Sequence, residues 1–173
     1  MYLIGPMGSG KTAVGKQLAK DVGLQFFDSD LEIQKRTGVD IPYIFEKEGE
    51  AGFREREADV IAELCGLQDV VVATGGGAIL TQRTRARLAA TGLVIYLQTD
   101  IDEQFKRTKR ARHRPLLANK NRREVLEHLA SVRAPLYTQI ADIAVDTSGK
   151  RVKAVAQELA LLIADHGFAS LQN

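Results

Sequence analysis

One short motif near the start of the chain constrains the fold more than any other feature. Residues 5 to 12 read Gly-Pro-Met-Gly-Ser-Gly-Lys-Thr and match the phosphate-binding pattern G-x-x-x-x-G-K-[ST] at every fixed position. The apolar run 2–4 before the motif predicts a strand, and helical apolar spacing resumes from Thr12. In such a context, backbone N–H groups and a helix N-terminus bind phosphate oxygens.

The motif assigns roles to its own residues. We expect Lys11 to reach the β- and γ-phosphates of a nucleotide and the Thr12 hydroxyl to ligate Mg²⁺. The nucleotide-binding residues expected here are Gly8, Ser9, Gly10, Lys11, Thr12 and Ala13. A chance glycine turn is the alternative, and the flanking strand and helix argue against it.

Length and composition predict one globular domain that spans residues 1–173. The net charge of +2 gives no reason to expect a nucleic-acid partner, and no apolar run reaches the length of a membrane span. A single cysteine, Cys65, suits a reducing compartment, so we expect a cytoplasmic protein. No long apolar stripe is left unassigned, which favours a monomer.

Strands and helices alternate along the chain. Apolar runs predict strands at 2–4, 24–27, 69–73, 93–97 and 142–146, and helical spacing predicts helices at 12–22, 31–37, 41–49, from 52, 82–91, 101–109, 124–134 and 152–165. This alternation predicts an α/β fold of three layers, a five-stranded parallel sheet with helices on both faces. Ser29 or Asp30 is expected to cap the second helix, and the segment around Pro135 is expected to break the helix before it.

Polar residues follow two of the predicted strands. Asp28 and Asp30 end the second strand, at the sheet edge where ligands of open α/β sheets collect. The third strand ends in Gly75-Gly76-Gly77, without the aspartate that holds the metal in many P-loop enzymes. Asp28 is therefore the nearest candidate for supporting Mg²⁺, and the glycine triplet suggests close approach of a ligand to the backbone.

Two charged segments allow more than one interpretation. Arg54 and Glu57 can share one helix face, and the pattern alone does not separate a surface ion pair from a pocket wall. The basic run 106–114 can be a solvated face, a nucleic-acid patch or a mobile lid over a phosphate. The lack of interleaved aromatic residues argues against the nucleic-acid interpretation.

Beyond the P-loop, the chain contains Phe27-Asp28-Ser29-Asp30, Gly52-Phe53-Arg54-x-x-Glu57, Ala73-Thr74-Gly75-Gly76-Gly77, Arg114-Pro115-Leu116-Leu117 and Arg133-x-Pro135-Leu136-Tyr137. In this order and spacing, the set resembles the shikimate kinase family over about residues 2 to 160. The resemblance implies a P-loop kinase fold with a substrate-binding section at about 29–57 and a mobile lid at about 109–121. It also implies transfer of the γ-phosphate of ATP to the 3-hydroxyl of shikimate, in aromatic amino acid biosynthesis.

The resemblance further implies a role for each motif residue. Arg54 and Arg133 would bind the substrate carboxylate, Glu57 would orient Arg54, and Gly75, Gly76 and Gly77 would contact the substrate through their backbone. Asp30 would orient, and in one interpretation deprotonate, the attacking hydroxyl. Asp28 would hold Mg²⁺ beside Thr12, Arg114 would close over the phosphates, and Arg107 and Lys150 would lie near the adenine.

Three other functions compete with this one. A related small-alcohol kinase, such as one for gluconate, would share the loop and lid but not the set of Asp30, Arg54, the glycine triplet and Arg133. A nucleoside monophosphate kinase would bind an anionic acceptor, which the Asp28–Asp30 pair would repel. A nucleotide-hydrolysing switch would lack the residues that converge on an acceptor.

Overall fold

A computed structural model of the chain describes residues 1–109 and 121–168. Its centre is a sheet of five strands, β1 (Tyr2–Ile4), β2 (Gln25–Asp28), β3 (Val70–Ala73), β4 (Val94–Gln98) and β5 (Ile143–Asp146). All neighbouring strands are parallel, in the order β2-β3-β1-β4-β5. The chain moves outward from β1 to β2 on one side and later returns to β4 on the other, so the strand order reverses at β1.

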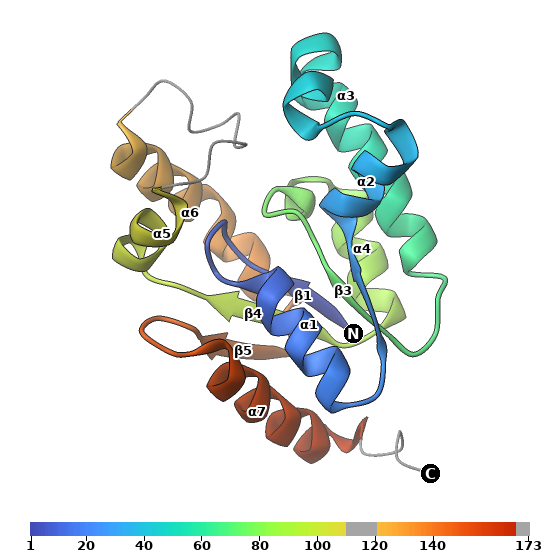
Figure 1. Cartoon of the computed structure of the whole chain (residues 1–173), viewed down its shortest axis with the longest axis vertical. Coiled ribbons are helices and arrows are strands. Elements are labelled where there is room, and N and C mark those ends of the chain that lie inside the picture. Colours follow the sequence, from blue (N-terminus) through green and yellow to red (C-terminus); the bar gives the residue numbers. More distant parts are fainter. Residues whose placement is uncertain (110–120, 169–173) are drawn as a thin grey trace.

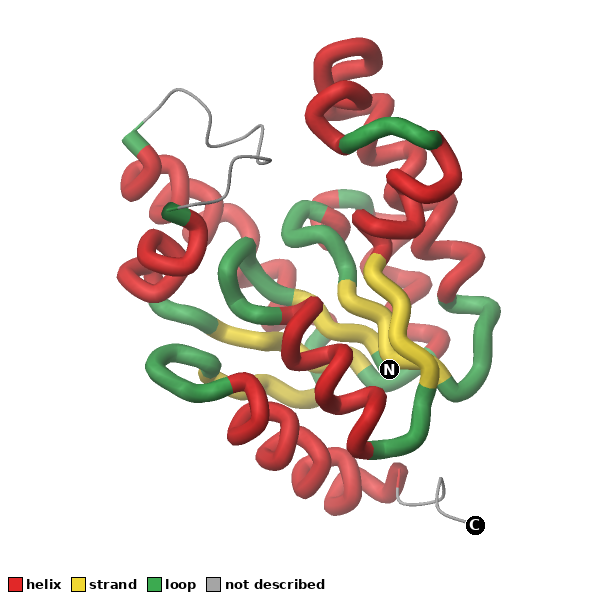
Figure 2. The backbone as a smooth tube through the Cα atoms, in the orientation of Figure 1, coloured by secondary structure: helices red, strands yellow, loops and turns green. Residues whose placement is uncertain are grey.

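Helices cover both faces of the sheet (Figures 1 and 2). Helices α1 (Lys11–Asp21) and α7 (Val152–Ile163) pack on one face, and α7 runs on into a π-helical end, η3 (Ala164–Phe168). The opposite face packs against α2 (Ser29–Thr37), α3 (Ile41–Leu64), the 3₁₀ turn η1 (Ala78–Leu80), α4 (Gln82–Thr91) and α6 (Arg122–Ile140). Helix α5 (Ile101–Thr108) follows β4 and packs beside α6. The predicted three-layer α/β architecture is confirmed.

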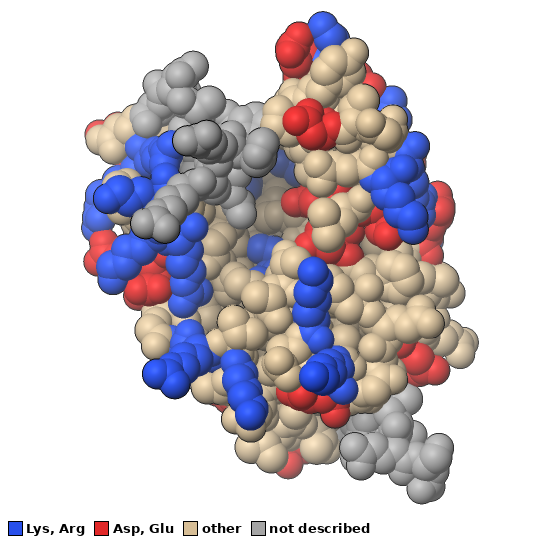
Figure 3. Space-filling view, in the orientation of Figure 1, with Lys and Arg blue, Asp and Glu red and all other residues tan. Residues whose placement is uncertain are grey.

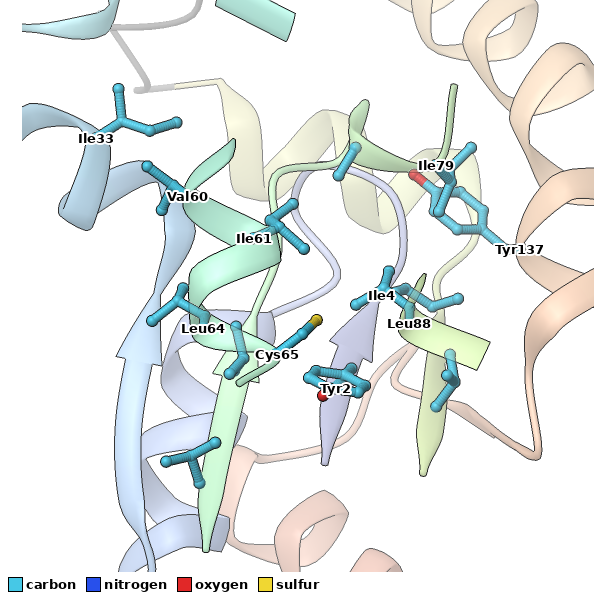
Figure 4. Packing of buried hydrophobic residues seen from close by; sticks show 14 of the residues in the cluster. Tyr2, Ile4, Ile33, Val60, Ile61, Leu64, Cys65, Ile79, Leu88 and Tyr137 are labelled. Atoms are coloured by element: carbon cyan, nitrogen blue, oxygen red, sulfur yellow. The ribbon is translucent and has the colours of Figure 1, made fainter. Parts of the chain in front are cut away.

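The central strands form because their side chains can be buried on both faces. In β1, Tyr2 and Ile4 pack into the core on the α3 side, whereas Leu3 packs against the α1 and α7 side. In β3, Val70 and Val72 join the first cluster and Val71 joins the second, which is the period of two expected for a strand. Figure 4 shows the first cluster at close range. Continuous apolar runs are typical of parallel strands buried in this way.

The predicted helix break around Pro135 is wrong. Helix α6 continues through Pro135 and ends at Ile140. A proline inside a helix removes one hydrogen bond and costs about 3 kcal/mol. Tertiary contacts beside Pro135 favour the continuous helix: Tyr137 is almost fully buried and its ring stacks on Tyr96 with centroids 4.9 Å apart, and Arg133 donates a hydrogen bond to Gly76 O.

The predicted cap of the second helix is also wrong, by one or two residues. Asp28 is the N-cap of α2, and its side chain accepts hydrogen bonds from the backbone N–H groups of Asp30 and Leu31. Ser29 lies inside the helix, and its hydroxyl has a different partner that is described below. Aspartate is as good an N-cap as serine, so sequence preference alone could not choose among neighbouring residues.

The section before β3 agrees with the predicted pair of helices. Helix α3 is interrupted at Gly49, whose φ of 71° and ψ of −177° are not helical, and the second part carries the buried side chain of Phe53. Within the described part of the chain, no helix is long and apolar enough to cross a membrane. Arg114, most of the predicted lid and residues 169–173 lie outside the described residues.

Candidate active site

The five parallel strands all deliver their following loops to one edge of the sheet. The P-loop follows β1, Asp28 to Asp30 follow β2, and the glycine triplet follows β3. In Figure 3 this face of the molecule is hollowed, with Lys and Arg side chains in and around the hollow and Asp and Glu side chains along one border. Loops that converge at the carboxyl edge near a reversal of strand order form the usual ligand site of open α/β sheets.

The P-loop has the backbone that its sequence predicts. Gly8 and Gly10 have φ values of 80° and 90°, and Gly10 is the N-cap of α1 in the left-handed conformation. The Lys11 ammonium lies across the loop, where Nζ donates to the carbonyl oxygens of Gly5 at 2.7 Å and Pro6 at 2.8 Å. A helix N-terminus, a lysine and a glycine-rich turn thus meet at one point, as a phosphate site requires.

Thr12, at the start of α1, lies next to Asp28, at the end of β2. The Thr12 hydroxyl donates to Asp28 Oδ2 at 2.6 Å. A hydroxyl and a carboxylate beside a phosphate loop are hard oxygen donors, which suit Mg²⁺ bound jointly by protein and phosphates. Among the residues that the structure describes, no group of three or more His, Cys, Asp or Glu side chains could hold a metal by itself. Any metal here would therefore depend on the ligand for much of its coordination.

The Arg54 side chain is largely buried and paired with two glutamates. It is 14% exposed and donates from Nη1 to Glu57 Oε2 at 2.6 Å and from Nη2 to Glu50 Oε1 at 2.9 Å. The Glu57 side chain is only 2% exposed, which excludes the alternative of a solvated surface pair. Glu50 was not among the predicted residues, although it lies four positions before Arg54, within reach on one helix face.

Glu57 is a buried acidic group of this site, and its surroundings alter its pKa. Burial raises its pKa to about 7; the Arg54 charge opposes this rise, and the Asp30 charge adds to it. For Arg54, burial alone would lower the pKa, but the ion pairs with Glu57 and Glu50 outweigh it and leave the pKa raised. The buried carboxylate and guanidinium therefore depend on each other, and Asp30 lies close enough for its charge to act on Glu57.

The glycine triplet passes very close to these side chains. A Cβ on Gly75 would meet Glu57 Oε1 and Asp30 Oδ1, and a Cβ on Gly77 would overlap the Arg54 guanidinium. The loop is held by hydrogen bonds from two sides. Gly75 N–H donates to the buried Ser29 hydroxyl at 3.0 Å, and Gly76 O accepts from Arg133 Nη1 at 3.2 Å and from the Tyr137 hydroxyl at 2.5 Å.

Arg133 reaches the same loop from α6. It is 5% exposed, and burial lowers the pKa of its guanidinium. The Arg54 charge lowers it further, so the two guanidinium groups lie close enough to repel each other. Within the described residues, Arg133 Nε and Glu57 Oε1 are buried without a hydrogen-bond partner. Two neighbouring cations with an unused donor form a site for an anion with planar oxygens.

The two residues expected near the adenine lie at the far side of the P-loop. Arg107 donates to Gly8 O at 3.1 Å and to Thr147 O at 2.8 Å, so it connects the P-loop to the loop after β5. Lys150 lies in that same loop, where Nζ pairs with Glu158 at 2.7 Å. The link through Thr147 could not be found from sequence, because no pattern marks a threonine that pairs across loops.

Comparison with known proteins identifies the family. A family profile described as shikimate kinase matches residues 7–164. A shikimate kinase of Alteromonas mediterranea is 52% identical over 159 residues, which cover 92% of this chain and 93% of the relative. The chain belongs to the shikimate kinase family.

Solved structures agree with this assignment. The structure of a shikimate kinase from Acinetobacter baumannii in complex with shikimate has a TM-score of 0.94 and 45% identity, and the match covers 95% of this chain and 92% of that one. A gluconokinase from Sinorhizobium meliloti has a TM-score of 0.56 at 17% identity, with 98% of this chain and 95% of that one covered, and shares the fold alone. Shikimate kinase family members therefore resemble this chain far more than the competing small-alcohol kinase does.

Proposed function

We propose that the protein transfers the γ-phosphate of ATP to the 3-hydroxyl of shikimate, in the pathway to aromatic amino acids. The observation that carries this proposal is the pair of buried guanidinium groups, Arg54 and Arg133, beside the glycine triplet. Shikimate is a ring carboxylate with three hydroxyls. Its carboxylate would relieve the repulsion between the two arginines and accept hydrogen bonds from both planar forks.

The other residues of the pocket would orient the ring. Glu57 would fix the Arg54 guanidinium through the 2.6 Å ion pair, so that Arg54 keeps part of its fork for the substrate. Asp30, at the start of α2, would accept a hydrogen bond from the attacking hydroxyl. The backbone of Gly75, Gly76 and Gly77 would allow the ring to approach closely, since these residues have no side chains.

The phosphates of ATP would bind on the other side of the hollow. Backbone N–H groups of residues 8–13 and the Lys11 ammonium would surround the phosphate oxygens, and Lys11 would neutralise charge that develops during transfer. Thr12 and Asp28 would hold Mg²⁺ there. When bound, this ion would supply charge neutralisation at the phosphates. Arg107, Lys150 and, from the predicted lid, Arg114 complete the proposed nucleotide site.

The reaction itself needs little covalent work from the protein. The hydroxyl oxygen forms a bond to the γ-phosphorus while the bond from that phosphorus to the bridging oxygen breaks, leaving ADP. The hydroxyl proton passes to the Asp30 carboxylate or directly to an oxygen of the transferred phosphoryl group. Because phosphoryl transfer proceeds through a loose transition state, positioning of the hydroxyl should contribute more than the basicity of Asp30.

A monomeric, cytoplasmic enzyme remains our prediction. It is supported by a single buried cysteine, Cys65, and by large exposed apolar residues that, in the described part of the chain, come from several different elements.

Identification of the product tests the proposed function. The protein is incubated with MgATP and shikimate, and the product is examined by ³¹P and ¹H NMR. We expect one phosphorus coupled to the proton on carbon 3 of the ring. Phosphorylation at another hydroxyl, or faster phosphorylation of gluconate than of shikimate, would refute the assignment of the acceptor.

A further inference from the structure

Tyr137 is a buried polar group that the proposed reaction does not use. It projects from α6, is 2% exposed, and belongs to the same core cluster as Ile79 of η1 (Figure 4). Its ring stacks on Tyr96 at an interplanar angle of 25°. Burial raises the pKa of its hydroxyl far above the ordinary value, so the group stays a neutral donor.

The Tyr137 hydroxyl donates to Gly76 O, in the middle of the glycine triplet. Arg133, one helical turn earlier on the same face of α6, donates to the same oxygen. Both hydrogen bonds to this carbonyl oxygen therefore come from α6. Tyr137 and Arg133 also border a cavity of about 200 Å³, which Pro6 and Met7 of the P-loop line as well.

A fixed carbonyl also fixes the next N–H group. In a planar trans peptide, the C=O of Gly76 and the N–H of Gly77 point in opposite directions. Because Gly76 O faces α6, Gly77 N–H faces away from α6. Within residues 1–109 and 121–168, neither Gly76 N–H nor Gly77 N–H donates a hydrogen bond, whereas Gly75 N–H is engaged by Ser29. The clamp on Gly76 O therefore sets the direction of a backbone donor that is open to a ligand.

We propose that Tyr137 is a positioning residue for the acceptor substrate: its hydroxyl orients the Gly76–Gly77 peptide so that the Gly77 N–H can bind the substrate. This inference rests on the proposed function, since it gives the acceptor site one more component. The two hydrogen bonds of the clamp join α6 to Gly76 and do not involve the proposed nucleotide-binding residues 8–13, so the effect of Tyr137 should be confined to the acceptor.

Steady-state kinetics of Tyr137→Phe, with Tyr96→Phe as the matched control, test this inference. Both changes remove the hydroxyl of a buried tyrosine and keep a stacked aromatic pair, but in the described residues the Tyr96 hydroxyl has no hydrogen bond to the glycine triplet. We expect KM for shikimate to rise roughly three- to tenfold in Tyr137→Phe, as for the loss of one hydrogen bond. KM for ATP should stay within about twofold, and Tyr96→Phe should change neither value by more than that.

Three other results would overturn the inference. An unchanged KM for shikimate in Tyr137→Phe, an equal rise of both KM values, or the same rise in Tyr96→Phe would each assign Tyr137 to packing alone. Thermal unfolding of both variants accompanies the kinetics, and a rise in KM that is confined to shikimate, with Tm lowered by no more than about 2 to 6 °C for one lost hydrogen bond, supports positioning. Wild-type protein in the same assay separates the two claims, because a wild type that ignores shikimate refutes the proposed function itself.

Discussion

The raised pKa of Glu57 makes the stability of the protein depend on pH in a direction opposite to that of most carboxylates. The pKa is 4.5 for an ordinary glutamate and about 7 for Glu57 in the fold, chiefly because the group is buried. Between these two values, the folded chain holds a proton that the unfolded chain has released. The contribution of Glu57 is therefore fully present below pH 4.5 and is lost as the pH rises through 7.

The size of the effect follows from the difference in pKa. A shift from 4.5 to about 7 corresponds to about 3 kcal/mol in the free energy of unfolding, most of which is lost between pH 5 and 8. Glu57→Gln cannot titrate and keeps the shape of the side chain. The free energy of unfolding of the wild type, minus that of Glu57→Gln, should therefore fall by about 2 to 3 kcal/mol from pH 5 to 8.

Urea unfolding at pH 5, 6, 7 and 8 measures this difference. Glu63→Gln is the control, because Glu63 also pairs with an arginine at 2.8 Å but has a side chain that is 64% exposed. The free energy of unfolding of the wild type, minus that of Glu63→Gln, should change by less than about 1 kcal/mol over the same pH range. A difference for Glu57→Gln that stays constant, or that rises with pH, would refute the reasoning about its burial.

Further substitutions test the other parts of the site. Arg133→Ala should raise KM for shikimate roughly ten- to hundredfold through loss of a charged hydrogen bond, and an equal rise in KM for ATP would contradict its assigned role. Asp28→Asn keeps an N-cap for α2 but removes the charge beside Thr12, so the Mg²⁺ concentration for half-maximal activity should rise; an unchanged requirement would exclude Asp28 from the metal site. Gly75→Ala should lower Tm by several degrees more than Gly76→Ala, because only the first Cβ would overlap Glu57, and equal Tm values would show that the loop can move aside.

The strands and the P-loop could be predicted because their signals are local. Each buried parallel strand is a continuous apolar run, and the loop Gly5 to Thr12 carries its backbone conformation in its glycines. The convergence of Asp28 and the glycine triplet also followed from topology, because parallel strands end at one edge. The register of β2 and β3 then places Asp28 opposite Ala73, two residues before the glycine triplet.

The errors arose where distant contacts override a local rule. Proline breaks helices on average, but in this chain the contacts of Arg133 and Tyr137 with Gly76 and Tyr96 favour a continuous α6. That error also hid Tyr137, since a continuous helix would have placed it on the same face as Arg133. The Arg54–Glu57 pair could not be assigned to a pocket from spacing alone, because the same spacing occurs on solvated helices. Capping preference also could not show that the Ser29 hydroxyl accepts from Gly75 N–H, because that contact joins two segments far apart in the sequence.

Release of ADP from MgATP, measured with and without shikimate, tests the central claim most directly. We predict release of ADP that depends on shikimate and that is lost in Lys11→Ala. The Lys11 ammonium lies over the phosphate loop in the wild type, and this variant lacks it. Together, these two results would establish both the acceptor and the role of the P-loop. Release at the same rate without shikimate would contradict the account, because it would mean that Arg54, Arg133 and the glycine triplet do not bind this acceptor.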